Sequence, residues 1–297
     1  MINNSFFSTE ILRWFRENGR DLPWRETKDP YAIWLSEIIL QQTRIVQGWE
    51  YWERFMQTYP KVEDLAAASE DDVLKLWQGL GYYSRARNLH AAAKQIVALG
   101  SFPNTLDGIK SLKGVGDYTA AAIGSFAFDI PAAVVDGNVY RVLSRYFGID
   151  TPINSTQGKK EFAALAQSLL PASDAASYNQ GMMDFGAIQC TPQSPKCLLC
   201  PLAETCEALR CGRVEELPVK NKTVKVKTRH LSYIYIRCKS SVADGAENTE
   251  PMIAIHRRGE GDIWQGLWEP YNVSDVKELP SFVKNPILLA KDVKHVL

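Results

Sequence analysis

Four cysteines within a short stretch constrain this chain more than any other feature of its sequence. Their spacing is Cys-x6-Cys-x2-Cys-x5-Cys, at Cys190, Cys197, Cys200 and Cys206. Thiolates so close in sequence can reach one centre without help from distant segments, and a structural zinc ion or a [4Fe-4S] cluster would each accept four of them. Disulfides are the alternative, which the lack of a secretion signal in MINNSFFSTE disfavours. By spacing alone, Cys211 could replace Cys206 as the fourth ligand.

Length and charge balance exclude several classes of protein. The 297 residues include 34 Lys+Arg and 34 Asp+Glu, and 45% are hydrophobic, which fits two or three domains with buried cores rather than a disordered, collagen-like or coiled-coil chain. Zero net charge gives no support for a nucleic-acid partner, although only a local patch is needed to bind phosphate. No apolar run reaches the roughly 18 to 20 residues of a membrane helix. We expect no membrane association and an intracellular location, cytoplasmic in a bacterium and nuclear or organellar in a eukaryote.

The spacing of apolar residues divides the chain into regions. From about residue 5 to 185 they recur at helical intervals, as at Val139, Leu143 and Phe147, and glycine or proline separates the segments. The run KNKTVKVKTR at 220–229 holds five basic and no acidic residues, which fits both a solvated linker and a strip that contacts phosphates. Beyond it, HLSYIYIRC at 230–238 and MIAIH at 252–256 predict a hairpin with a long connection. We expect Cys238, within the first of these strands, to be a buried apolar residue.

The segment LKGVGDYTAAAI at 112–123 predicts a tight turn followed by a helix. Gly114 and Gly116 flank Val115, and the helix would begin near Asp117. Backbone amides in such a turn, together with the unpaired N–H groups of the helix start, can hold a phosphate oxygen. Taken alone, the pattern fits an ordinary helix–helix turn equally well.

Two carboxylates stand in contrasting surroundings. Glu37 lies in YAIWLSEIILQQT, a predicted helix that is apolar on all sides, so burial should raise its pKa and favour the protonated acid. The alternative is a glutamate that reaches solvent at a helix end. Asp136 directly precedes another predicted helix, which it could simply cap, and we expect this position to lower its pKa. One protonated and one ionised carboxyl is the pair that cleavage of a glycosidic bond requires.

Six segments, in this order and followed by the four cysteines, resemble the adenine DNA glycosylase (MutY) family of the endonuclease III superfamily. They are LPWRET at 22–27, WLSEIILQQT at 34–43, GLGYYSRARNLH at 79–90, KGVGDYTAAAI at 113–123, VDGNVYRV at 135–142 and NQGMMDFGA at 179–187. The resemblance implies a mainly α fold with a two-part helical core: a six-helix domain with a helix-hairpin-helix motif at 27–134, and an iron-sulfur cluster domain formed by 1–26 and 135–213. A basic linker at 214–229 and a partial α/β Nudix-like domain at 230–297 would follow. It also implies a [4Fe-4S] cluster rather than zinc, held by Cys206 rather than Cys211.

The resemblance further implies roles for single residues. Glu37 would protonate the adenine, and Asp136 would stabilise the cationic sugar, with Tyr118 and Asn138 in support. Gln42 and Tyr82 would wedge the duplex, although a polar helix residue and a core aromatic are their ordinary interpretations. Further DNA or base contacts would come from Trp24, Arg25, Thr43, Arg85, Gly114, Val115, Gly116 and Asp184. The implied partner is double-stranded DNA with an adenine mispaired with 8-oxoguanine or guanine, bound by a monomer.

Position 118 distinguishes activities within that superfamily. Members that also cleave the strand carry a lysine there as Schiff-base nucleophile, whereas this chain has Tyr118 before Thr119. Without the amine no imine can form, so we expect a monofunctional glycosylase. A bifunctional glycosylase/lyase and a non-catalytic metal-containing DNA-binding module are the competing interpretations.

The segment IAIHRRGEGDIWQGLWEP at 253–270 resembles the start of the Nudix-like domain that recognises 8-oxoguanine in this family. It is not followed by a Nudix hydrolase box, so pyrophosphohydrolase activity is not indicated. The sequence stops at KDVKHVL, where family members continue with a recognition loop containing Ser and His. We therefore expect a partial domain, which leaves direct recognition of 8-oxoguanine by this chain in question.

Overall fold

The computed structural model describes residues 4–221, 228, 230–238, 252–262, 264–273, 287–291 and 293. The chain forms two compact units, Met1–Thr223 and Val224–Leu297. Their boundary falls within the segment 214–229 that the sequence indicates as a linker. Four basic residues of that segment, Lys222, Lys225, Lys227 and Arg229, lie outside the described residues. None of the described helices is long and apolar enough to cross a membrane.

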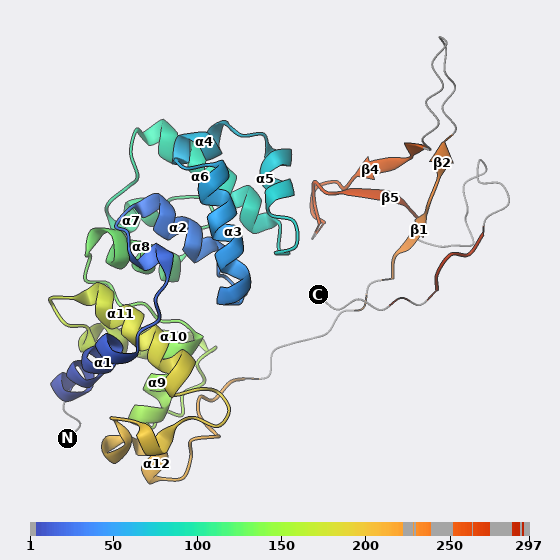
Figure 1. Ribbon diagram of the computed structural model, residues 1–297. Helices are drawn as coiled ribbons and strands as arrows, with labels where there is room; N and C mark the ends of the chain where they lie inside the picture. The colour runs from blue at the N-terminus through green and yellow to red at the C-terminus, as the bar shows by residue number, and fades with distance from the viewer. Residues whose placement is uncertain are drawn as a thin grey trace. The chain divides into compact units, whose positions relative to one another are not determined.

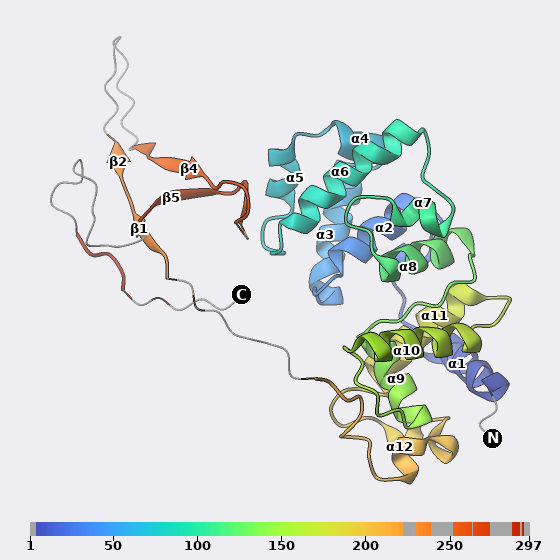
Figure 2. The same cartoon turned by 180° about the vertical axis from the view of Figure 1, so that it is seen from behind.

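The first unit is built from helices in two groups, which both views show (Figures 1 and 2). One group holds α2 (Pro30–Ile39), α3 (Ile45–Thr58), α4 (Val62–Ala67), α5 (Glu70–Leu76), α6 (Ser84–Leu99), α7 (Leu106–Lys110) and α8 (Asp117–Phe128). The other holds α1 (Asn4–Asn18), α9 (Gly137–Phe147), α10 (Thr156–Leu169), α11 (Ala175–Asp184) and α12 (Glu207–Arg210). The mainly helical fold class is thereby confirmed, while the finer domain boundaries stay a prediction.

Helix α2 is central to the first group. Asp29 caps its N-terminus by accepting a hydrogen bond from the amide of Tyr31, and Pro30 occupies the first turn, where its missing N–H costs nothing. The helix packs against the alanine-rich α8, and Ile33 joins Ala122 and Phe126 in a shared core. Small side chains on α8 let the two helices approach closely, which places the middle of α2 in the interior.

The second group has its own core. Phe7 and Ile11 of α1 pack with Leu143 of α9 and Phe162 of α10, and all four side chains are fully buried. The irregular segment after α11 passes through a π-helical turn (Phe185–Gln189) and two short 3-10 helices (Cys197–Leu199 and Ala203–Thr205). This segment carries the four clustered cysteines, so α9 and α11 hold both ends of the loop against the core.

The second unit contains short antiparallel strands in its described residues. β1 (Ser232–Ile234), β5 (Trp268–Val273) and β4 (Ile255–Arg257) form one sheet in the order β1-β5-β4. β2 (Arg237–Cys238) pairs with β3 (Met252–Ile253), Arg237 opposite Ile253. The predicted hairpin between the two β-rich runs is therefore present, whereas the Nudix-like assignment stays a prediction.

Candidate active site

Glu37 lies in the middle of α2, where every residue from Tyr31 to Ile39 is buried. Its side chain is 7% exposed. Burial raises the pKa of this carboxyl to about 7, against the lowering effect of a hydrogen bond from Tyr118 and of the Arg25 charge, and the nearby Asp136 adds to the rise. The prediction that Glu37 is buried is confirmed, and burial favours the protonated form of this carboxyl.

Asp136 caps helix α9. Its Oδ1 accepts hydrogen bonds from the amides of Asn138 and Val139, both at 2.8 Å, and its Oδ2 accepts one from Nδ2 of Asn138 at 2.7 Å. The expected lowering of its pKa is wrong in sign: burial raises the pKa of Asp136, and these hydrogen bonds oppose the rise without reversing it. The helix terminus does stabilise the carboxylate, but desolvation is the larger effect here.

Tyr118 is hydrogen-bonded to Glu37 and lies close enough to Asp136 to be affected by its charge. It lies in the first turn of α8, and its hydroxyl donates a hydrogen bond to Oε2 of Glu37 at 3.1 Å. Burial raises the pKa of Tyr118 well above its ordinary value, and the charges of Glu37 and Asp136 add to this. The phenol therefore stays a neutral donor. Residues from three distant segments, α2, α8 and the start of α9, thus share one buried polar site.

A second polar cluster lies beside Glu37. Asp184, fully buried at the end of α11, accepts two hydrogen bonds of 2.8 Å from Arg25 and one of 2.9 Å from the backbone amide of Arg20. Burial alone would raise the pKa of Asp184, but the hydrogen bonds from the two arginines outweigh it and lower the pKa. Asp184 thus fixes Arg25, whose charge in turn acts on Glu37.

Trp24, which the sequence also indicated for the base pocket, is buried. Its ring makes edge contacts with the rings of Trp49 and Trp52 on α3, at centroid distances of 5.9 and 5.7 Å. It therefore packs the segment that carries Arg25 against the first helical group.

The predicted glycine turn joins α7 to α8. Gly114 adopts φ +79°, and a Cβ atom there would stand 2.7 Å from Cβ of Asn88 on α6, so glycine is required at this position. The amide of Val115 is used within the turn, donating to the carbonyl of Leu112 at 3.1 Å. Gly116 caps α8 and has open space around its Cα. The Val115 amide is therefore already paired within the turn, and phosphate binding by the amides of Gly116 and the first turn of α8 stays a prediction.

The two residues expected to wedge the duplex are both exposed and share an unusual backbone conformation. Gln42 follows the end of α2 with φ 58°, and Tyr82 precedes α6 with φ 45°, with 59% of its surface exposed. The core-aromatic interpretation of Tyr82 is therefore wrong. The Thr43 amide donates to the carbonyl of Leu40, a contact within the same segment. The guanidinium of Arg85 points inward, to backbone carbonyls of both segments.

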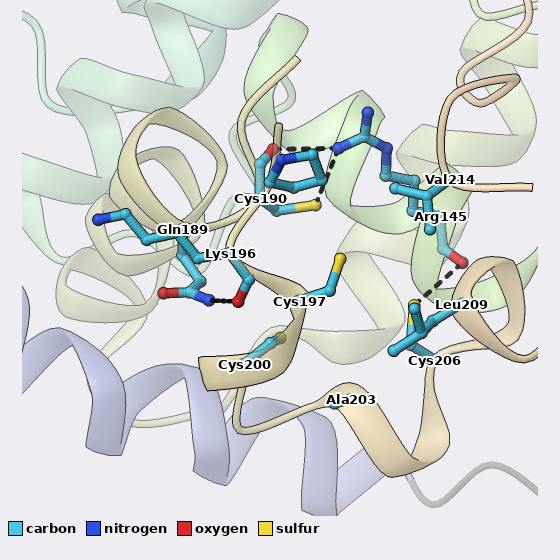
Figure 3. A pocket seen from close by; sticks show the side chains of 11 residues that line it. Arg145, Gln189, Cys190, Lys196, Cys197, Cys200, Ala203, Cys206, Leu209 and Val214 are labelled. Atoms are coloured by element: carbon cyan, nitrogen blue, oxygen red, sulfur yellow. Dashed lines mark hydrogen bonds between the residues drawn. The ribbon is translucent and has the colours of Figure 1, made fainter. Parts of the chain in front are cut away.

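The four clustered cysteines line one pocket (Figure 3). Burial raises the pKa of Cys200 to about 12 and also raises those of Cys197 and Cys206, so burial disfavours the thiolate form of these three side chains. Cys211 lies outside the pocket lining and donates to the Glu207 carboxylate at 3.3 Å. Although no three His, Cys, Asp or Glu side chains of the described chain are placed for a single metal ion, the shared pocket and its sulfur donors fit an iron-sulfur cluster.

Two buried arginines on α9 tie this pocket to the active site. Arg141 donates to Oδ1 of Asn138 at 2.8 Å and, through Nε, to the carbonyl of Cys190 at 2.8 Å. Arg145 donates to the carbonyls of Thr191 and Leu217 at 2.7 and 3.1 Å and lies 3.4 Å from Sγ of Cys190. One helix therefore holds Asp136 at its N-terminus and the cysteine loop along its side.

The sequence interpretation missed these two arginines and Arg20. A signal for the first two was present in YRVLSRY, because arginines four residues apart share a helix face with apolar neighbours. Such spacing indicates that both arginines pair with buried acceptors, but it does not identify the carbonyls that accept their hydrogen bonds. Arg20 had no comparable signal, since its partner Asp184 lies 164 residues away.

The chain matches two sequence families. A model of the HhH-GPD superfamily base excision DNA repair proteins matches residues 35–171, and one of the iron-sulfur binding domain of endonuclease III matches residues 190–206. The adenine DNA glycosylase of Buchnera aphidicola subsp. Schizaphis graminum (strain Sg) is 33% identical over 294 residues, spanning 98% of this chain and 82% of that protein. This chain belongs to the adenine DNA glycosylase family.

Similar proteins also include a mammalian relative and a solved structure. The adenine DNA glycosylase of Mus musculus is 42% identical over 226 residues, which are 71% of this chain but only 44% of the mouse protein. A solved structure of a thermostable thymine-DNA glycosylase superposes with a TM-score of 0.66 at 34% identity, covering 70% of this chain and 97% of the other. The family match, the helix-hairpin-helix core and the iron-sulfur prediction at 190–206 are thereby confirmed. The single-residue roles stay predictions.

Proposed function

We propose that this protein removes adenine mispaired with 8-oxoguanine or guanine from duplex DNA by hydrolysing its N-glycosidic bond. One observation carries the proposal: Glu37, Tyr118 and Asp136 form a single buried site in which the pKa of Glu37 is about 7. Family membership supports adenine as the base that is released.

Glu37 supplies the proton in this reaction. The target nucleotide must leave the base stack to reach the buried site. Oε2 of Glu37 accepts the hydrogen bond from Tyr118, and we place the acid proton on the other oxygen, Oε1. It passes to a ring nitrogen of adenine, so that the base departs as a neutral molecule when the C1′–N bond breaks.

Asp136 faces the positive charge that remains on the sugar. Its carboxylate stabilises this oxocarbenium-like cation, and Asn138 and the α9 amides hold it in place. Glu37, now ionised, accepts a proton from the water that attacks C1′. The products are free adenine and an abasic site, and Glu37 returns to its protonated form.

Residues around the site bind the duplex. The amides of Gly116 and the start of α8 hold a phosphate of one strand, and Gln42 and Tyr82 occupy the space that the extruded base leaves. The four cysteines hold the [4Fe-4S] cluster, which supplies structural support to the loop at 190–206. We further propose that the protein acts on DNA as a monomer and, in a bacterial source, in the cytoplasm.

A single-turnover assay tests the proposal on duplexes with adenine opposite 8-oxoguanine, guanine or thymine. Glu37→Gln should slow adenine release by at least about 100-fold, since it removes the acid, while duplex binding persists. Glu50→Gln, an exposed glutamate on α3, is the matched control and should behave as wild type. Unchanged release by Glu37→Gln would refute the acid role.

The two competing functions give different results in the same assay. A bifunctional lyase would cut the strand without added alkali and leave an adduct that borohydride traps. Tyr118 in place of a lysine argues against this outcome. A non-catalytic binding module would hold the duplex and release no base from any mismatch.

A further inference from the structure

Arg85 makes an unusual set of contacts for a residue expected to bind DNA. From the first turn of α6, its Nη1 donates to the carbonyls of Ile38, Ile39 and Gln41 at 3.1, 3.2 and 2.5 Å. Its Nη2 donates to the carbonyls of Leu80 and Gly81 at 3.2 and 3.4 Å. One guanidinium therefore joins the C-terminal end of α2 to the segment before α6, and these two helices are in contact.

Each of the two joined segments leads directly into a strained residue. Gln42 and Tyr82 have side chains yet adopt φ 58° and 45°, a left-handed conformation that costs free energy and persists only where the surroundings hold it. Both are exposed, so packing of their own side chains does not hold them. Two of the carbonyls bound by Arg85 belong to the residues immediately before each, Gln41 and Gly81.

Other contacts hold only one of the two segments. The Tyr51 hydroxyl donates to the carbonyl of Gln78 at 2.6 Å, and the Trp77 indole donates to that of Gly81 at 2.9 Å. The Arg85 guanidinium also lies 5.1 Å from the Trp77 ring centroid and 5.7 Å from that of Tyr82. These contacts stabilise the loop before α6, and among the hydrogen bonds of the described residues those that join this loop to the end of the Glu37 helix come from Arg85.

We propose that Arg85 is a positioning residue that holds Gln42 and Tyr82 at a fixed distance from each other and from Glu37, so that base extrusion delivers adenine to the acid. This inference rests on the proposed function. A planar guanidinium with donors on two nitrogens can bind both segments at once, whereas a lysine ammonium concentrates its donors at one point. The role therefore requires arginine, not merely a positive charge.

Three variants separate positioning from phosphate binding. Arg85→Lys keeps the charge, Arg85→Met removes it, and Lys94→Met removes an exposed charge from the same helix as a control. We expect Arg85→Lys to slow single-turnover adenine release about 10-fold and Arg85→Met about 100-fold, with duplex affinity within about twofold of the Lys94→Met value. Full activity of Arg85→Lys, together with weaker binding by Arg85→Met, would identify a phosphate contact and overturn the proposal.

A double-mutant cycle tests whether Arg85 acts through the wedge. Tyr82→Ala removes the ring and leaves the Arg85 hydrogen bonds to Leu80 and Gly81. If Arg85 acts by placing Tyr82, the double variant Arg85→Lys/Tyr82→Ala should be little slower than the slower single variant. If the fold-losses in rate of the two single variants multiply in the double variant, Arg85 and Tyr82 act independently, which would contradict the proposal. Tyr82 is exposed, and Arg85→Lys preserves the charge, so we expect both variants to fold. A melting curve for each variant checks this.

Extrusion can also be measured without base release. With 2-aminopurine in place of the target adenine, the wild-type protein should raise its fluorescence on binding, and Arg85→Lys should give less than about half of that rise. Equal fluorescence in the two proteins would overturn the positioning role. If the wild type extrudes 2-aminopurine but releases no adenine, the proposed function fails and the Arg85 inference survives.

Discussion

At the scale of single residues, the site depends on how strongly burial acts on two carboxyl groups. Desolvation raises the pKa of both Glu37 and Asp136, and the difference between them lies in what opposes it. Asp136 receives hydrogen bonds from two backbone amides and one side-chain amide, whereas Glu37 receives one from a neutral phenol. The larger number of donors at Asp136 supports the proposal that Glu37 is the acid and Asp136 the carboxylate.

The pH dependence of excision should follow Glu37. The acid must be protonated before base release, so the single-turnover rate should fall as pH rises through about 7. Tyr118→Phe removes the hydrogen bond that lowers the Glu37 pKa and should move this fall to higher pH. Rates measured between pH 5.5 and 9, values chosen to span roughly the titration, check both statements. A profile that Tyr118→Phe leaves in place would contradict them.

Stability should depend on pH through the same group. The folded pKa of Glu37, about 7, lies above its ordinary value of 4.5, so the folded state binds the proton more tightly than the unfolded state. Its contribution is fully present below pH 4.5 and is lost as pH rises through 7, a difference of about 3 kcal/mol. In urea unfolding, Glu37→Gln should therefore gain stability relative to wild type on going from pH 5 to pH 8. A constant difference between the two proteins would argue against a buried acid.

At the scale of elements, α9 contacts both the proposed active site and the cysteine loop. Asp136 and Asn138 lie at its N-terminus, and Arg141 and Arg145 face the loop from the same helix. The arginines satisfy carbonyl groups that an irregular loop cannot pair within itself. A segment with only short helical turns is thereby fixed to a rigid helix, which orients its thiols.

Removing one of these arginines should loosen the loop. Arg145→Met leaves the carbonyls of Thr191, Pro192 and Leu217 without this donor, and we expect a loss of about 3 kcal/mol in unfolding free energy. The variant should also lose its absorption near ~400 nm, typical of the iron-sulfur cluster, faster than wild type under a chelator. Arg210→Met, at an exposed arginine on α12, is the control. Equal decay in all three proteins would show that Arg145 does not secure the loop.

At the scale of the whole molecule, the chain separates into two compact units. The unit Met1–Thr223 contains the carboxyl pair, the glycine turn and the cysteine pocket together with two helical cores. Asp184 on α11 binds Arg20 and Arg25, so that the segment between α1 and α2 is fixed to the second helical group. The parts of the proposed reaction are therefore complete within this unit.

A protein ending at residue 223 should accordingly fold and excise adenine. We expect a cooperative melt and adenine release from duplexes with guanine opposite the target at a rate within about tenfold of the full chain. Preference for 8-oxoguanine over guanine should fall if the segment at 230–297 recognises that base. An insoluble or inactive 1–223 protein would show that the second unit is required for the core activity.

The sequence alone determined the helical class, the buried position of Glu37 and the clustering of the cysteines, because these depend on local spacing, whereas the choice of Cys206 over Cys211 came from the family resemblance. Apolar residues on every side of a helix force burial, and four thiolates close in sequence can converge without the rest of the chain. Only the tertiary structure brought Glu37, Tyr118 and Asp136 together, reversed the expected direction of the Asp136 pKa, and turned Arg85 toward backbone carbonyls. The desolvation of Asp136 and the carbonyl partners of Arg85 depend on segments far apart in the chain, so a local sequence pattern cannot predict them.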